Sequence, residues 1–262
     1  MRRNTRSWLA AMAIAAVYLA ACQTVPITGR SQMLLISEPE EVKMGYSAYR
    51  EVLEKEKISH DPRANELVTR VGRRIAAATG KTDYQWEFKV IDNDKTVNAF
   101  CLPGGKVAVY TGILPVTKDE AGLAAVIGHE VAHAIARHGG ERVSHQMAAQ
   151  GVTVALAVGM MASGKSDRAN LYAGLLGAGL TVGVLLPYSR LQESEADRMG
   201  LIYMAKAGYN PTAARDLWVR MAENAKGGKP PELLSTHPAD STRIRQIEGW
   251  LPEAMQYYRP GK

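Results

Sequence analysis

The chain has 262 residues, of which 46% are hydrophobic and 22% are charged, and this is enough to build the core of one domain, or of one domain with an appendage. The formal charge of +6 overstates the basicity of the folded part, because Arg2, Arg3 and Arg6 lie in a segment that we expect to be removed. The remaining 29 basic and 26 acidic residues nearly balance, and no lysine- and arginine-rich block is interleaved with aromatic residues. This composition argues against a nucleic-acid partner.

Residues 1–21 have the features of a signal peptide, with a basic start followed by an uncharged apolar run. The run is shorter than the about 20 residues that a comfortable transmembrane helix needs. It ends in Leu19-Ala20-Ala21-Cys22, which is similar to the lipobox of bacterial lipoproteins, where a peptidase cuts before a cysteine that carries lipid. An ordinary signal peptide with an incidental cysteine and an uncleaved anchor are the alternatives.

We therefore expect lipid on Cys22 and a tether over residues 22–37 that contains a short strand. An aspartate directly after the cysteine would resemble a signal for retention in the inner membrane, but this position holds Gln23, which favours the outer membrane. The sequence thus predicts a bacterial outer-membrane lipoprotein that faces the periplasm and contacts the membrane through its lipid. Residues 38–262 are expected to form a single domain.

Two helices and a small sheet are expected next. Acidic residues and early prolines predict helices over residues 38–57 and 61–80. Alternating polar and apolar residues predict a strand at 84–91, and the tight turn indicated by Gly104-Gly105 separates two further strands expected at 97–102 and 106–111. We expect an edge of this sheet to lie above the functional site, where an extended peptide could pair with it.

Helices dominate the rest of the chain. A central helix is predicted from about Lys118 to His138, with a capping box at Thr117-Lys118-Asp119-Glu120 and a stop at Gly139-Gly140. The apolar, glycine-rich residues 151–187 predict a helical hairpin that either packs on the core or contacts a membrane and gates the site. Further helices are expected at 189–207, at 210–225 and around residues 243–247.

Two histidines lie one turn apart in the central helix, in the stretch Gly128-His129-Glu130-Val131-Ala132-His133. Because positions 129 and 133 share a helix face, both imidazoles can bind one Zn²⁺ ion, and Glu130 can act on water as a general base. Of the other four histidines, His60, His138 and His145 show no partner pattern, and we interpret them as surface or core residues.

A hydrolytic zinc site needs a third protein ligand, and Glu193-Ser194-Glu195-Ala196-Asp197 is the best source in the chain. Glu195 is chemically possible as that ligand. Helical geometry favours Glu193 with Asp197 instead, because these positions share a face whereas position 195 points about 160° away.

These motifs together resemble the gluzincin peptidases, in the family that includes the HtpX heat-shock protease and the CAAX prenyl endopeptidases. With its lipobox and short length, the chain looks most like the periplasmic lipoprotein members of the LoiP type. The matching segments follow the order of the family over roughly residues 85–247; they are Asn98-Ala99-Phe100, Pro103-Gly104-Gly105, His129-Glu130-x-x-His133, Glu193-x-x-Ala196-Asp197 and Ser235-Thr236-His237-Pro238 with Arg243.

The resemblance implies a zincin-like α+β fold that is mainly helical, with a small β-sheet beside the helix of the two histidines. It implies one Zn²⁺ per chain with Glu193 as its third ligand, and Asp197 as the group that fixes the tautomer of a ligand histidine. His237 is then the catalytic group that stabilises the oxyanion, or else a fourth zinc ligand in a latent state.

The resemblance also implies that Arg243 supports the oxyanion and that Asn98 and Ala99 bind the substrate backbone. The predicted function is zinc-dependent hydrolysis of peptide bonds in unfolded or misassembled cell-envelope proteins. A peptidase of narrow specificity is one alternative, and an outer-membrane assembly factor or chaperone with little proteolysis is another. Glu130 argues against the latter, because a purely structural zinc site is closed by four ligands and needs no general base.

Overall fold

The computed structural model describes residues 22–162, 189–226, 232–237 and 241–260. The described residues belong to two compact units, one within Met1–Ser37 and Gly139–Leu186 and the other within Glu38–His138 and Pro187–Lys262. The signal peptide predicted at residues 1–21 lies outside the described residues. The domain boundaries drawn from the sequence stay a prediction.

The first unit contains β1 (Cys22–Thr24) paired antiparallel with β2 (Ser31–Met33), and most of α6 (His138–Ala162). Both guanidinium ends of Arg30 donate hydrogen bonds to the Glu141 carboxylate, at 2.6 and 2.8 Å, which fastens the β-hairpin to α6. Among the described helices, none is both long and apolar enough to cross a membrane. The second half of the hairpin predicted at residues 151–187 lies outside the described part of the chain.

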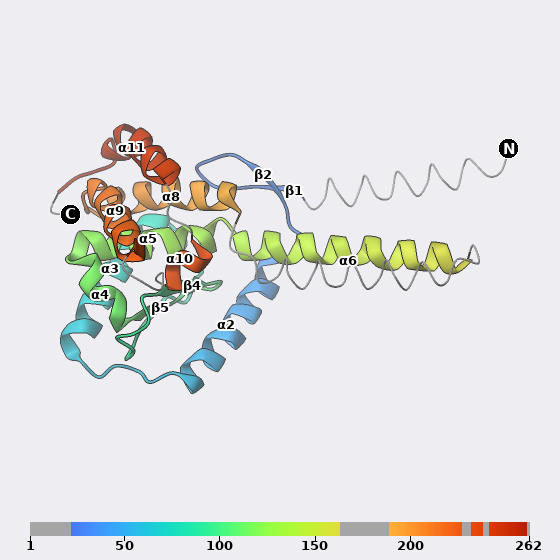
Figure 1. Ribbon diagram of the computed structural model, residues 1–262, viewed down its shortest axis with the longest axis horizontal. Helices are drawn as coiled ribbons and strands as arrows, with labels where there is room; N and C mark the ends of the chain where they lie inside the picture. Colours follow the sequence, from blue (N-terminus) through green and yellow to red (C-terminus); the bar gives the residue numbers. More distant parts are fainter. Residues whose placement is uncertain (1–21, 163–188, 227–231, 238–240, 261–262) are drawn as a thin grey trace. The chain divides into compact units, whose positions relative to one another are not determined.

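The second unit contains a three-stranded sheet in the order β3-β5-β4. β3 (Glu87–Ile91) pairs in parallel with β5 (Lys106–Tyr110), and β4 (Ala99–Leu102) pairs antiparallel with the other side of β5. The central strand β5 is buried along its whole length, while β4 forms an edge. Figure 1 shows α5 (Glu120–Ile135) between this sheet and α8 (Arg190–Lys206), and α5 packs against both β4 and α8.

Helices make up most of the second unit, as predicted, and confirm the mainly helical α+β class. Ser189 and Gln192 form a capping box at the start of α8, and Asp61 caps α3 (Pro62–Thr79). The remaining elements are α2 (Glu38–Lys55), η1 (Thr111–Ile113), α4 (Leu114–Thr117), α9 (Thr212–Lys226), α10 (Glu232–Thr236) and α11 (Ser241–Met255).

The ends of the central helix α5 differ from the prediction. Asp119, rather than Thr117, caps its start by accepting a hydrogen bond from Gly122 N at 2.8 Å, because the Thr117 hydroxyl donates to a carbonyl group of α4. The helix ends at Ile135, and Gly139-Gly140 lie inside α6 instead of forming the stop. Both sequence assignments were therefore wrong.

Arg137 separates α5 from α6, because its backbone takes the left-handed conformation with a φ of 59°. This conformation costs a residue other than glycine about 1–2 kcal/mol. The Glu41 carboxylate accepts hydrogen bonds from Arg137 Nε at 3.1 and 3.2 Å and from Nη2 at 2.8 Å. Since both side chains are buried, breaking this pair would leave a charge unpaired at a cost of about 3–5 kcal/mol. The pair thus fixes where the chain turns.

Two glycines allow α5 and α8 to touch backbone to backbone. A Cβ atom on Gly128 would lie 3.1 Å from the carbonyl oxygen of Gly200, and one on Gly200 would lie 3.0 Å from the backbone nitrogen of His129. These neighbours are backbone atoms and cannot rotate away. The contact brings the carboxylates of α8 within reach of the histidines of α5.

We expect Gly200→Ala to destabilise the protein and Gly249→Ala to stabilise it, although both glycines lie in helices. Overpacking at the α5–α8 contact costs about 1–3 kcal/mol, whereas alanine gains about 1 kcal/mol over glycine in a helix interior. A Cβ atom on Gly249 would meet no described atom within 4 Å, so only the gain applies there. Urea unfolding followed by circular dichroism would measure both changes, and a raised midpoint for Gly200→Ala would contradict the close contact.

Candidate metal centre

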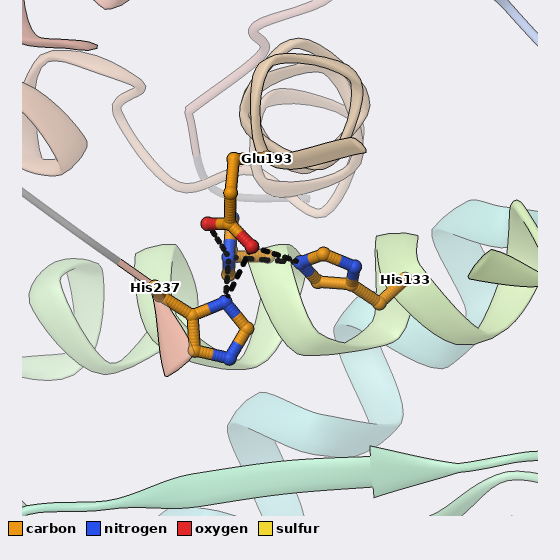
Figure 2. A group of neighbouring side chains, drawn as sticks. His133, Glu193 and His237 are labelled. Atoms are coloured by element: carbon orange, nitrogen blue, oxygen red, sulfur yellow. Dashed lines mark hydrogen bonds and ion pairs between the residues drawn. The ribbon is translucent and has the colours of Figure 1, made fainter. Parts of the chain in front are cut away.

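Four buried side chains bring their ligand atoms together beside the C-terminal half of α5. His129 and His133 come from α5, Glu193 comes from the first turn of α8, and His237 directly follows α10. One ligand atom from each residue lies within 4.8 Å of all the others. Figure 2 shows His133 and His237 pointing toward the Glu193 carboxylate from two sides.

The distances within this ligand group are short. His133 Nε2 lies 3.2 Å from His129 Nε2 and 3.3 Å from Glu193 Oε1. His237 Nδ1 lies 2.8 Å from Glu193 Oε1 and 3.2 Å from His129 Nε2. Three imidazole nitrogens and a carboxylate therefore face a common point.

This donor set fits zinc, which proteins bind through histidine nitrogens and carboxylate oxygens. Glu193 Oε2 is buried and accepts no well-aligned hydrogen bond from the described residues, although Arg243 Nη1 lies 3.1 Å away. A bound cation would satisfy this oxygen. We conclude that the residues present suit one Zn²⁺ ion.

The charges of the ligand group depend on one another. Burial and the Arg243 guanidinium disfavour a charged His129, but hydrogen bonds to Asp197 and Glu193 raise its pKa to about 9. Burial also opposes ionisation of Glu193, yet hydrogen bonds from the histidines hold the pKa of its carboxyl below the usual range. Burial lowers the pKa of His133. A proton on His129 thus balances the buried carboxylate, and a bound cation would supply the same balance.

Glu130 lies beside the ligand group. Its Oε1 is 3.6 Å from His237 Nε2 and accepts no hydrogen bond from the residues that the structure describes. Burial raises the pKa of the Glu130 carboxyl, although the neighbouring His237 and His129 oppose the rise. A buried carboxylate with an unused acceptor oxygen is suited to receive a proton.

Asp197 and Arg243 lie behind His129. Asp197 Oδ1 is 3.0 Å from His129 Nδ1, which leaves the Nε2 atom for the ligand group. Arg243 donates to both oxygens of Asp197, from Nε at 2.8 Å and from Nη2 at 2.7 Å. Its guanidinium also stacks on Trp218, with Cζ 3.3 Å from the ring centroid. These contacts hold Asp197 in place, and support of an oxyanion by Arg243 stays a prediction.

The edge strand β4 presents only part of the predicted substrate-binding pair. The Asn98 carbonyl accepts a hydrogen bond from Tyr110 N at 3.1 Å, and Asn98 Oδ1 accepts one from Ala99 N at 2.9 Å. Successive residues of an antiparallel pair alternate between facing the partner strand and facing away. The main chains of Ala99 and Cys101 therefore face away from β5, and substrate pairing there stays a prediction.

Some residues of this region were missed from the sequence. His138 is fully buried and contacts His133, and Trp218 packs against His129 with ring centroids 5.7 Å apart. Glu195 points to His138 and not into the ligand group, as the helical spacing predicts. His138 lies five positions after His133, and Trp218 comes from a separate helix, α9. Helical spacing relates neither residue to the ligand histidines, so the sequence could not predict that they belong to this region.

Comparisons with known proteins identify the family. The sequence pattern of peptidase family M48 matches residues 62–251. The mitochondrial metalloendopeptidase OMA1 of Schizosaccharomyces pombe is 41% identical over 243 residues, which cover 91% of this chain and 69% of that protein. The OMA1 of Saccharomyces cerevisiae is 30% identical over 98% of this chain and 77% of its own length. The beta-barrel assembly-enhancing protease of Escherichia coli is 28% identical over 88% of this chain and 48% of its own length.

These relatives correct one prediction and confirm others. The predicted location in a bacterial outer membrane is wrong on this comparison, because the relatives at 41% and 30% identity are mitochondrial enzymes by name. The narrower likeness to HtpX and the LoiP type stays a prediction. The predicted class, a zinc metalloendopeptidase, is confirmed by the match over residues 62–251 and by the metalloendopeptidase relatives. The chain belongs to peptidase family M48.

Proposed function

We propose that this metalloendopeptidase hydrolyses peptide bonds in unfolded or misassembled polypeptides, as part of protein quality control. The proposal depends on one observation above all, the buried group of ligand atoms within 4.8 Å of one another beside the Glu130 carboxylate. The family match supports the type of reaction. A relative named for enhancing β-barrel assembly supports a substrate that has not reached its assembled state.

In this proposal His129, His133 and Glu193 hold the zinc ion. When bound, the zinc polarises the scissile carbonyl group and lowers the pKa of water. Asp197 accepts a hydrogen bond from the N–H group at His129 Nδ1, so that the unprotonated Nε2 faces the metal. Arg243 holds Asp197 in position through its two hydrogen bonds.

Glu130 serves as the general base and then as the general acid. Its carboxylate takes a proton from the attacking water, and the raised pKa of this buried carboxyl makes it a stronger base than an exposed glutamate. The same oxygen then returns the proton to the leaving amine. His237 Nε2, 3.6 Å from Glu130 Oε1, lies close enough to this step to meet the carbonyl oxygen of a substrate.

His237 is proposed to stabilise the negative charge that develops on that carbonyl oxygen. Its Nδ1 atom lies among the ligand atoms, which is where a fourth ligand would sit in a latent enzyme. The two roles exclude each other at any one time. They predict opposite effects of removing the side chain.

The substrate is proposed to lie as an extended chain along β4. The main chains of Ala99 and Cys101 face away from β5, so the Ala99 carbonyl and the polar groups of Cys101 could pair with a peptide added at that edge. Asn98 would contribute by holding the Ala99 amide with its side-chain oxygen, 2.9 Å away. Such main-chain pairing would accept many sequences, which suits an enzyme that acts on unfolded chains.

The rival proposals are a peptidase of narrow specificity and an assembly factor that rarely cleaves. The first would cleave one protein and leave casein intact. The second would bind unfolded chains without using Glu130. Glu130 is buried beside the ligand group with an unused acceptor oxygen, which favours hydrolysis.

The first test replaces the general base. Glu130→Gln should lower casein hydrolysis by about 10²- to 10⁴-fold, while zinc content measured by atomic absorption stays at one ion per chain. A chelator should abolish wild-type activity, and added zinc should restore it. Glu66→Gln, on the exposed face of α3, is the matched control and should cleave at the wild-type rate. Equal activity of Glu130→Gln and the wild type would remove the basis of the proposal.

The second test removes the ring of His237. His237→Ala should retain zinc and lose about 10²- to 10³-fold in kcat, as expected when a donor to the oxyanion is lost. Zinc content and the kinetics of a fluorogenic peptide would be measured on the same preparation. A rise in activity with zinc retained would show instead that the side chain blocks the site as a fourth ligand.

We propose further that lipid on Cys22 attaches the chain to a membrane. Cys22 is exposed, and Cys101 is the second of the two cysteines in the sequence. In cells fed a palmitate analogue, the wild type and Cys101→Ser should become labelled, whereas Cys22→Ser should not. Label that persists in Cys22→Ser would contradict the proposal, as would an unlabelled wild type.

A further inference from the structure

We infer that His138 and Glu195 form a hydrogen-bonded relay behind His133, which fixes the tautomer of this histidine and raises its basicity toward the metal. The inference rests on the proposed role of His133 as a zinc ligand. His138 Nδ1 lies 2.9 Å from His133 Nδ1, and His138 Nε2 lies 3.3 Å from Glu195 Oε2. The relay thus runs from the metal-facing ring through a second imidazole to a carboxylate.

Only one arrangement of protons satisfies these contacts when His133 binds a metal. The ligand atom Nε2 then carries no proton, so the neutral ring carries its proton on Nδ1 and donates it. His138 Nδ1 must accept that hydrogen bond, which leaves the proton of the neutral His138 ring on Nε2. That N–H group donates to the Glu195 carboxylate. Every nitrogen of the two rings therefore has a defined role.

Burial makes the relay effective. The His138 ring is fully buried and Glu195 is 5% exposed, so water does not compete strongly for their hydrogen bonds. A hydrogen bond is electrostatically stronger at low dielectric than in water. The negative charge of Glu195 is therefore transmitted through His138 as increased electron donation by His133.

The two α5 histidines are supported in parallel ways. Asp197 contacts His129 Nδ1 directly at 3.0 Å, whereas Glu195 reaches His133 Nδ1 through His138. Both carboxylates come from α8. Partners of this kind typically change metal affinity or activity by about 10- to 100-fold when they are replaced. His138 and Glu195 are therefore positioning residues, since neither would contact the substrate.

The test compares zinc affinity and ligand geometry in three variants. Glu195→Gln keeps the shape but removes the charge, His138→Phe removes the hydrogen bonds, and His138→Gln restores a side chain that can accept and donate. We expect Glu195→Gln and His138→Phe to bind zinc about 10- to 100-fold more weakly in competition with a chromophoric chelator. The visible absorption of the Co²⁺-loaded protein should shift in both variants. His138→Gln should recover part of the loss.

Glu253→Gln removes an ion pair between α11 and Arg198 of α8 and should leave zinc affinity and the Co²⁺ spectrum unchanged. If Glu195→Gln binds zinc as tightly as the wild type and its Co²⁺ spectrum is unaltered, the relay is overturned. If circular dichroism shows that His138→Phe is unfolded, the result for Glu195→Gln alone decides the test. Wild-type zinc affinity in His133→Ala would overturn the ligand assignment instead, so the two failures can be told apart.

Discussion

The backbone contact of α5 with α8 is the constraint on which the metal centre depends. Helices with ordinary side chains at their crossing lie about 8–10 Å apart, whereas Gly128 and Gly200 let these two come closer. A glutamate on α8 can then reach the imidazoles of α5 directly. The same close approach brings Asp197 to His129 Nδ1. It also brings Glu195 to His138, which in turn contacts His133 Nδ1.

Charge balance is the second condition, because the centre is buried in an otherwise apolar region. Glu193 and Asp197 are nearly inaccessible to water, and a buried charge needs compensation. Arg243 compensates Asp197, while hydrogen bonds from the histidines compensate Glu193. A divalent cation would add a positive charge beside Glu193 and satisfy its second carboxylate oxygen. The polar residues are therefore arranged for a positive charge at their centre.

The parts of this site that follow helical spacing could be predicted, and those set by distant contacts could not. His129, His133, Glu193 and Asp197 occupy positions four apart on regular helices, so a local rule brings each pair to one face. The end of α5 follows no such rule. Arg137 adopts the left-handed backbone conformation that ends α5, and its side chain pairs with Glu41, 96 residues away in the sequence. The Gly139-Gly140 pair, which resembles a helix stop, lies inside α6 instead. The place of His138 beside His133 could not be foreseen from the sequence.

The carboxylates of α8 show how burial changes the meaning of a sequence pattern. Glu195 points about 160° away from Glu193 around the helix, and on a surface helix it would face water. Here α8 packs against α3, α5 and α11, so this residue is buried as well and needs a partner of its own. Glu193 meets the ligand histidines, Asp197 meets Arg243, and Glu195 meets His138. Because most residues of α8 around these carboxylates are buried, each carboxylate there must be explained by what it binds.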